Sequence, residues 1–366
     1  GESAAMNIII SLSAFALLAA VVLAAPPMIM NEPRVALTVS YCPTVFSGSG
    51  AVISVDPHTG NFTVEAKGWS WPDSGSWGCP ENQDPDVLVD TDSVWLQFTS
   101  DWGFTTEVSM KTGKVEKSFK GKTKELEFDG FTAFTRKGFN FHGITPGVTE
   151  EGFCDDGCFQ YGKQSTVTGE FVGEEYVPFK AAMTNVAHVD EDNNIFYTQC
   201  SYPLNDTVKC SNNDTDQCLV ALDATTGAFL SSKLMNKVEI YSWAPHPDKD
   251  GSMLAWVFGF MDVCKHPYND FAFARVHPAN ATAELIACIP HNVTVDMDEN
   301  IAAFTQDGTL FATGSGNAET GHVQILVLEP STGALALQTN LTGIKEALGV
   351  STDAPFVNVW AVNWMN

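Results

Sequence analysis

A short turn recurs six times along the chain at a nearly constant interval, and this repeat constrains the fold more than any other feature of the sequence. Between successive copies, the last residue of the turn advances by 52 to 58 residues. A period of this size is typical of repeated supersecondary units. The six copies are DPHTG (56–60), SMKTG (109–113), STVTG (165–169), DATTG (223–227), HPANA (277–281) and EPSTG (329–333).

Each copy is predicted to be a hairpin turn, because it separates two segments of alternating polarity, as in AVISVDPHTGNFTVEA. A leading Asp or Glu accepts backbone N–H groups within the turn, and glycine supplies the positive φ that a tight hairpin needs. A second hairpin precedes most copies, so the repeating unit has four strands, here called A to D. These upstream hairpins are predicted at 87–98, 131–143, 185–199, 241–259 and 300–314.

Four antiparallel strands repeated at this period form the blade of a β-propeller. The first unit lacks a strand A, whereas an orphan strand, PFVNVWAVNW, follows the last unit at 355–364. Pairing of this orphan with the first unit would remove the open sheet edges. We therefore predict an all-β, six-bladed β-propeller closed by the C-terminal strand joining blade one. Seven blades are the alternative if residues 143–164 contain extra strands.

The motif Ala221-x-Asp223-x-x-Thr226-Gly227 resembles the blade motif of the quinoprotein-like (PQQ-like) β-propeller superfamily. The resemblance covers only the C–D hairpins and implies the fold. The tryptophan that this family carries four residues after the glycine is absent, and so is the adjacent cysteine pair of its quinone dehydrogenases. The resemblance therefore does not imply a quinone cofactor. The residues at the tryptophan position are Val64, Lys117, Gly173, Ser231, Leu285 and Leu337.

The N-terminal region predicts export. Residues 1–25 contain a short upstream remnant followed by MNIIISLSAFALLAAVVLA, an apolar run that ends in small residues and is interpreted as a signal peptide. A retained signal anchor is the alternative, but no basic flank accompanies the run. Residues 26–366 are then a single β-propeller domain of a secreted, extracellular protein. Six glycosylation sequons agree with this assignment and begin at Asn61, Asn205, Asn213, Asn280, Asn292 and Asn340.

All nine cysteines follow the apolar run, and in an oxidising compartment they predict disulfides. Zinc is disfavoured, because no CxxC pair occurs. Every cysteine maps to the rim formed by the B–C and D–A connections. We expect disulfides to hold that rim as a preformed binding face, although long secreted loops also need disulfides for stability. The cysteines are Cys42, Cys79, Cys154, Cys158, Cys200, Cys210, Cys218, Cys264 and Cys288.

The formal net charge of −25 excludes nucleic acid and anionic membrane surfaces as partners, since both require a basic face. Cations, neutral sugars and basic proteins remain. One loop, WSWPDSGSWGCP, contains three tryptophans, Trp69, Trp71 and Trp77, which are candidates for stacking on a sugar ring or on a partner's side chains. The competing interpretation is a small core folded over the loop.

Acidic and amide residues stand at the start of the predicted A strands, which line the central channel. Gathered oxygen ligands of this kind bind Ca²⁺, whereas dispersed acids only solubilise a rim. The candidate ligands are Asp86, Asp129, Asn185, Glu239, Asn300 and Asn358. Three histidines near the same rim, His142, His266 and His291, are candidate acid–base groups or solvated bystanders.

The sequence thus favours a secreted glycoprotein that binds a glycan or protein ligand through a disulfide-stapled face. The alternative is a Ca²⁺-dependent lactonase or esterase with an acidic central channel, since six-bladed paraoxonase-like and gluconolactonase-like propellers hold calcium in such a channel. That similarity is one of architecture only. Whether the protein is an enzyme is left open.

Overall fold

The computed structural model describes twenty-two segments of the chain, and within several of them only the backbone course is described. They are residues 33–44, 47–69, 86–89, 92–98, 104–120, 132–135, 140–146, 148–149, 152–153, 159–165, 167–169, 171–177, 183–200, 217–235, 238–245, 250–260, 262–264, 271–289, 302–305, 307–317, 322–350 and 357–365. The predicted signal region, 1–25, lies outside them. In these segments no helix is long and apolar enough to span a membrane.

Residues 34–365 form one compact unit, a β-propeller whose strands pair into antiparallel four-stranded sheets. Five sheets are each built from one continuous stretch of chain. Their strands are β4 (Asp86–Val89), β5 (Ser93–Phe98), β6 (Phe104–Ser109) and β7 (Val115–Lys120); β8 (Thr132–Thr135), β9 (Asn140–Pro146), β12 (Phe159–Ser165) and β13 (Phe171–Val177); β14 (Met183–Asp190), β15 (Ile195–Cys200), β16 (Cys218–Asp223) and β17 (Phe229–Leu234); β18 (Glu239–Pro245), β19 (Met253–Phe258), β20 (Phe271–His277) and β21 (Thr282–Cys288); and β22 (Ala302–Phe304), β23 (Phe311–Asn317), β24 (His322–Glu329) and β25 (Ala334–Leu341).

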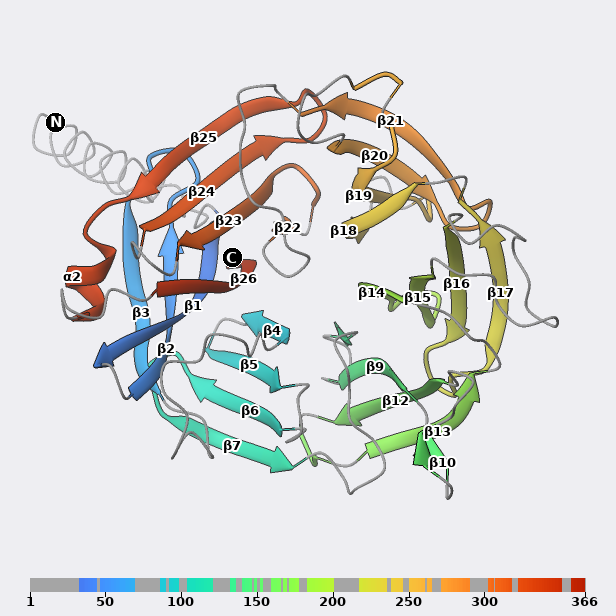
Figure 1. The fold of residues 1–366 in the computed structure, drawn as a ribbon, viewed down its shortest axis with the longest axis horizontal. Helices are drawn as coiled ribbons and strands as arrows, with labels where there is room; N and C mark the ends of the chain where they lie inside the picture. Colours follow the sequence, from blue (N-terminus) through green and yellow to red (C-terminus); the bar gives the residue numbers. More distant parts are fainter. Residues whose placement is uncertain are drawn as a thin grey trace, which may run out of the picture. The chain divides into compact units, whose positions relative to one another are not determined.

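The remaining four-stranded sheet is composite and has the order β26-β1-β2-β3, with β1 (Arg34–Thr44), β2 (Ser47–Val55), β3 (Phe62–Trp69) and β26 (Val357–Met365). The C-terminal strand β26 pairs with β1 from Arg34 opposite Met365 to Tyr41 opposite Val357. Figure 1 shows β26 beside β1, between the sheets that contain β4 and β22.

The blade count needs correction. Six turns predict six blades, whereas only five blades are continuous in the chain; the first sheet is complete only when β26 joins β1 to β3. The seven-blade alternative is wrong: in the described residues between β9 and β12, the chain adds only the two-stranded sheet of β10 (Val148–Thr149) and β11 (Gly152–Phe153).

The core lies between facing sheets, which explains why the alternating segments fold in this way. Side chains of β1 and β2, such as Leu37 and Ile53, pack with Ile325 of β24 and Val359 of β26. The opposite face of the same sheet packs on the next blade, where Val52 meets Leu96 of β5. The composite sheet is therefore buried on both faces, and burial of its alternating apolar residues holds the two ends of the chain together.

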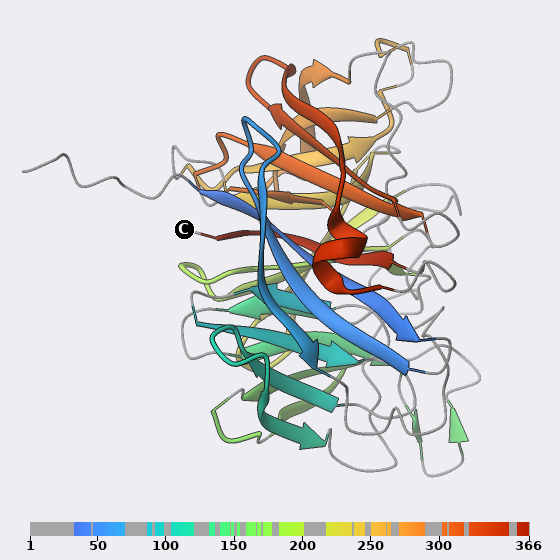
Figure 2. The same cartoon turned by 90° about the vertical axis from the view of Figure 1, so that its left-hand side faces the viewer.

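A short helix, α2 (Ile344–Leu348), connects β25 to β26. It buries Ile344 and Leu348 in the core of the composite sheet. Lys67 of β3 donates from Nζ to the carbonyl oxygen of Ala347, 2.7 Å away. Figure 2 shows α2, in red, against the blue strands of this sheet. The helix therefore helps to hold the returning chain beside β3.

The recurring turn has a local physical explanation. In the copy at 223–227, the Asp223 carboxylate accepts the N–H groups of Thr225 and Thr226 at 2.9 and 2.8 Å, and the Gly227 N–H donates to the Asp223 carbonyl at 2.8 Å. Gly227 has φ of +74°, which side-chain-bearing residues rarely adopt. The same contacts recur in the copy at 56–60, where Asp56 accepts the N–H of His58.

The turn glycine also has a packing role. A Cβ on Gly227 would come within 2.5 Å of the Tyr161 ring, which belongs to the preceding blade. The Tyr161 hydroxyl donates to the carbonyl oxygen of Ala224 at 2.7 Å, so the ring is fixed against the turn. In the copy that closes at Gly60, a Cβ would lie 2.9 Å from Thr339 of β25. The repeat therefore marks points where one blade touches another.

Candidate functional site

The connections of the propeller fall on two rims. The A–B and C–D turns form the turn rim, and the B–C and D–A connections form the loop rim. In the blade β18–β21, the loop rim contains the start of β18, the end of β19, the start of β20 and the end of β21. Side chains from strands far apart in the sequence therefore meet at this edge.

One acid and three aromatic rings gather at the loop-rim end of this blade. Glu239, the first residue of β18, pairs with Phe258 of β19, and Phe258 pairs with Phe271 of β20. Directly paired residues point to the same face of a sheet. Tyr241 places its ring 5.0 Å from that of Phe271, nearly perpendicular to it. All four side chains are partly exposed. We call Glu239, Tyr241, Phe258 and Phe271 the Glu239 cluster.

The carboxyl group of this cluster is electrostatically perturbed. Burial raises the pKa of Glu239 above its usual range, and a hydrogen bond from the Tyr241 side chain partly opposes this rise. Burial disfavours the charged form of a carboxyl group, whereas a hydrogen bond to its oxygens favours that form. Glu239 therefore offers a partly buried carboxyl group, beside apolar rings, that can form hydrogen bonds with a polar ligand.

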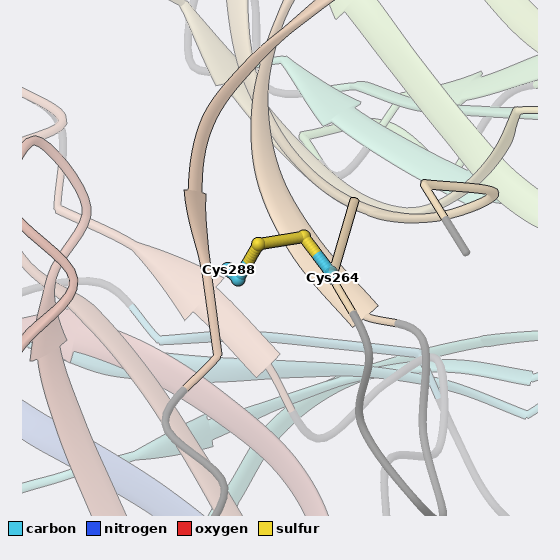
Figure 3. Close-up of a disulfide and its surroundings, with 2 residues drawn as sticks. All are labelled: Cys264 and Cys288. Carbon is cyan, nitrogen blue, oxygen red and sulfur yellow. A yellow bond between two sulfur atoms is a disulfide. The ribbon is translucent and has the colours of Figure 1, made fainter. Parts of the chain in front are cut away.

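A disulfide fixes the turn that follows Phe258 in the chain, and Cys288 pairs with Ala272, so the bond lies on the opposite face of the sheet from Phe271. Figure 3 shows the bond between Cys264, in the turn after β19, and Cys288, the last residue of β21. Their Cα atoms lie 5.3 Å apart. The N–H groups of Val263 and Cys264 both donate to the carbonyl oxygen of Phe260, which closes the turn. Val263 itself is 62% exposed on this anchored turn.

The described cysteines agree with the predicted stapled rim. Cys264 and Cys288 are bonded to each other, and Cys218, at the loop-rim start of β16, is also disulfide-bonded. All three positions lie on the loop rim. The disulfide state of the other six cysteines is not part of the described structure and stays a prediction.

The predicted calcium ligands start the innermost strands, but their oxygen atoms are not shown to converge. Asp86 begins β4, Asn185 lies third in β14, Glu239 begins β18, and Asn358 lies second in β26. Side chains are described only for Glu239 and Asn358, while Asp129 and Asn300 lie outside the described residues. Within the described part of the chain, no three His, Cys, Asp or Glu side chains form a metal-binding group.

Of the three candidate acid–base histidines, only His142 falls in a described segment. It lies third in β9, opposite Ala133 and Lys163, and so within a sheet rather than in a rim loop. His266 and His291 lie outside the described residues.

The tryptophan loop is described only at its first residue. Trp69 ends β3 and is 3% exposed, packed with Ala66 and Leu96 between two sheets. Its indole ring covers Gly50, where a Cβ would collide with it. Trp69 is therefore a core residue and offers no face to a ligand, while Trp71 and Trp77 lie outside the described residues.

Three of the six sequons can be located. Asn61, Asn280 and Asn340 are exposed, so their side-chain amides are open to modification. Asn61 and Asn280 belong to the turn rim, whereas Asn340 stands near the loop-rim end of β25. Asn205, Asn213 and Asn292 lie outside the described residues.

Sequence reasoning found Glu239 but missed its aromatic neighbours. In the sequence, nothing distinguishes Tyr241, Phe258 and Phe271 from other strand residues, and loops of different length separate their strands. Only their position could have indicated the cluster, because each lies at or near the loop-rim end of a strand in one predicted blade.

Comparisons with known proteins find only distant similarity to solved structures. No protein-family model matches the chain. No curated protein matches it either. Among solved structures, a periplasmic gluconolactonase of Pseudomonas aeruginosa is 9% identical with a TM-score of 0.46, covering 92% of this chain and 99% of its own. A putative TolB of Agrobacterium tumefaciens is 10% identical with a TM-score of 0.46, covering 92% of this chain and 100% of its own. Hydrazine synthase of Kuenenia stuttgartiensis is 11% identical with a TM-score of 0.43, covering 82% of this chain and 79% of its own.

The predicted resemblance to the quinoprotein-like propellers is accordingly supported only as a β-propeller arrangement. With no matching family model, the finer assignment has no support beyond the turn motif itself.

Proposed function

We propose that this protein is a secreted binding module that takes a carbohydrate ligand at the Glu239 cluster. The observation that carries the proposal is the cross-strand row of Glu239, Phe258 and Phe271, with Tyr241 beside it; a disulfide-anchored turn follows Phe258 in the chain. Partly exposed ring faces stack on the apolar faces of sugars. A half-buried carboxyl group binds sugar hydroxyls, because it accepts or donates hydrogen bonds according to its protonation.

The charge of the chain and the rigidity of the site also favour this ligand class. With a net charge of −25, the protein repels anionic ligands over long distances, whereas neutral sugars are unaffected. The Cys264–Cys288 bond holds the turn after β19 before any ligand arrives. A preformed site loses less conformational entropy on binding.

A glycan array followed by calorimetry tests the proposal. Phe271→Leu and Glu239→Gln should each weaken binding of an array ligand by about tenfold or more, since loss of a stacking ring or of a charged hydrogen-bond partner removes about 1–2 kcal/mol. The matched control is Phe62→Leu, which makes the same change at a half-buried ring on the turn rim. Equal binding by all three variants, or no array ligand for the glycosylated native protein, would contradict the proposal.

A calcium-dependent hydrolase is the second candidate. It is favoured by one observation: Asp86, Asn185, Glu239 and Asn358 all stand near the start of innermost strands, on the same rim. Neighbouring innermost strands contact each other, β26 with β4 and β14 with β18. A bound ion would raise the melting temperature by a few degrees at a concentration about a hundredfold above its Kd. Identical melting in millimolar calcium and in chelator would remove this candidate.

A further inference from the structure

Two buried nitrogen atoms without partners belong to adjoining rings on the innermost strands β14 and β18. His188 of β14 and Trp243 of β18 have ring centroids 5.6 Å apart. His188 Nε2 and Trp243 Nε1 are both enclosed, and neither has a hydrogen-bond partner among the described residues. Leaving a buried polar atom unpaired costs about 1–3 kcal/mol, and such atoms are rare in folded proteins. Because these two unpaired nitrogen atoms belong to adjoining rings, one bound group could satisfy both.

The surroundings of this pair are aromatic, with one acid nearby. Tyr197 lies directly opposite His188 in the β14–β15 pairing, and its ring is 6.1 Å from that of Trp243. Asp190, two residues after His188, is the charged group that acts on both His188 and Tyr197. Its carboxylate accepts the backbone and side-chain N–H groups of Asn193, at 3.1 and 2.7 Å. The hydrogen bonds of the Asp190 carboxylate are therefore made within its own turn.

The imidazole of His188 is neutral at ordinary pH. Burial lowers the pKa of His188 to about 4, although the negative charge of Asp190 acts in the opposite direction. The residue as a whole keeps some solvent exposure, but Nε2 does not. Nδ1 is not among the enclosed unpaired atoms. With the proton on Nδ1, Nε2 is a hydrogen-bond acceptor.

The donor and acceptor pattern selects the missing group. The indole Nε1–H only donates, whereas Nε2 of the neutral imidazole accepts if the proton lies on Nδ1 and donates if it lies on Nε2. A hydroxyl group satisfies either case, because its oxygen accepts from the indole and it can donate to, or accept from, the imidazole. An ammonium group has no acceptor, and a carboxylate has no proton to donate and is repelled by Asp190.

We propose that His188 Nε2 and Trp243 Nε1 together bind one hydroxyl group between β14 and β18, supplied by an internal water molecule. Water fits a site that must be filled in every folded molecule, since buried water typically bridges polar atoms that would otherwise be unpaired. Both residues lie in the turn-rim half of their strands, so this site is separate from the Glu239 cluster, which begins β18. Its occupant ties two neighbouring blades together at their innermost strands.

Trp256 supplies an internal contrast. Its Nε1 is also enclosed and unpaired, but its ring packs on Phe271, Phe273 and Phe311. Among the described residues, the rings that contact Trp256 are all phenylalanines, which carry no nitrogen. An apolar environment of this kind holds no water. Trp256 should therefore behave as a buried, unbonded indole in the same molecule.

The test is NMR of the full chain labelled with ¹⁵N-tryptophan, in which Trp243→Phe and Trp256→Phe assign the two indole signals. We expect a water cross-peak to the Trp243 Nε1–H with the sign of a long-lived bound molecule, and none to the Trp256 Nε1–H. His188→Phe should abolish this cross-peak, whereas His58→Phe, at an exposed turn residue, should leave it unchanged.

The outcomes are distinguishable. If the water cross-peak is absent in buffer but the Trp243 signal shifts on addition of glycerol, the hydroxyl comes from an organic ligand and the water assignment is wrong. If neither effect is seen in a sample whose Trp256 signal reports the native fold, the hydroxyl-binding site is contradicted. A double-mutant cycle of His188→Phe and Trp243→Phe by thermal unfolding adds a readout: a shared occupant predicts non-additive changes, and additive changes contradict it.

Discussion

The two rims of the propeller are built by different means. On the turn rim, a carboxylate or hydroxyl caps the turn within five residues, as Asp223 does with Thr225 and Ser109 does with Thr112. On the loop rim of the blade β18–β21, the chain is held instead by a disulfide and by contacts among a row of partly exposed rings. Local hydrogen bonds specify the first rim and long-range contacts specify the second. The first repeats and carries the fold, whereas the second varies and is free to carry function.

The largest effect should come from removing the contact that joins the two ends of the chain. Deletion of residues 355–366 removes β26 and exposes the edge of β1, together with the apolar surface covered by Val357, Val359 and Val362. At roughly 1.5–3 kcal/mol for each large side chain, the loss approaches the whole stability of an ordinary domain. We expect a protein that fails to unfold cooperatively, measured by calorimetry.

Deletion of residues 1–5 is the control, since these residues precede the predicted signal peptide. An unchanged melting temperature after loss of β26 would contradict closure by the composite sheet.

The next effect concerns the loop rim alone. Replacing Cys264 and Cys288 by serine should lower the free energy of unfolding by about 3 kcal/mol, as expected for a bridge that spans 24 residues. The turn rim should keep its structure in this variant. Hydrogen exchange should accelerate after β19 and at the end of β21, while the turn at 223–227 keeps its protection. Equal acceleration on both rims would show that the rims do not differ as described.

On the turn rim, the sharpest test is a pair of glycines that share a positive φ but differ in their surroundings. Gly227 has φ of +74° and meets Tyr161, whereas Gly251 has φ of +78° and open space. Gly251→Ala should cost only the backbone strain, about 1 kcal/mol. Gly227→Ala should cost about 2 kcal/mol more, because the ring must move. Chemical denaturation measures the free energy of unfolding of both variants. Equal losses would contradict a role of Gly227 in the contact with Tyr161.

The smallest effect is the pH dependence of a turn cap. Hydrogen bonds from Thr226 hold the pKa of Asp223 below its usual range, so the folded state favours the carboxylate. This contribution is present above the unfolded pKa of about 3.9 and is lost as the pH falls through the lower folded value. Asp223→Asn should therefore lose less stability than the native protein between about pH 5 and pH 2. The exposed position limits the difference to about 1–2 °C in Tm.

The contrast between rims also explains what the sequence can predict. The turn repeat predicts the C–D hairpins, because Asp223 caps its own turn through local hydrogen bonds. The missing strand of the first unit and the orphan C-terminal strand predict the pairing of β26 with β1, but a count of six turns overstates the five blades that are continuous in the chain. The burial of Trp69 depends on Gly50, nineteen positions earlier, and the Glu239 cluster depends on the register of three strands. Such long-range pairings have no local sequence signature.

The most direct test is hydrogen-exchange footprinting of the protein produced in a eukaryotic secretory host, with and without a ligand found on the glycan array. We expect new protection on the loop rim, at the start of β18 and at the junction of β19 and β20, where Glu239, Phe258 and Phe271 lie. The turn at 223–227 should show no change. Protection confined to the turn rim, or absent from the Glu239 cluster while ligand binding is saturated, would contradict the assignment of function to the loop rim.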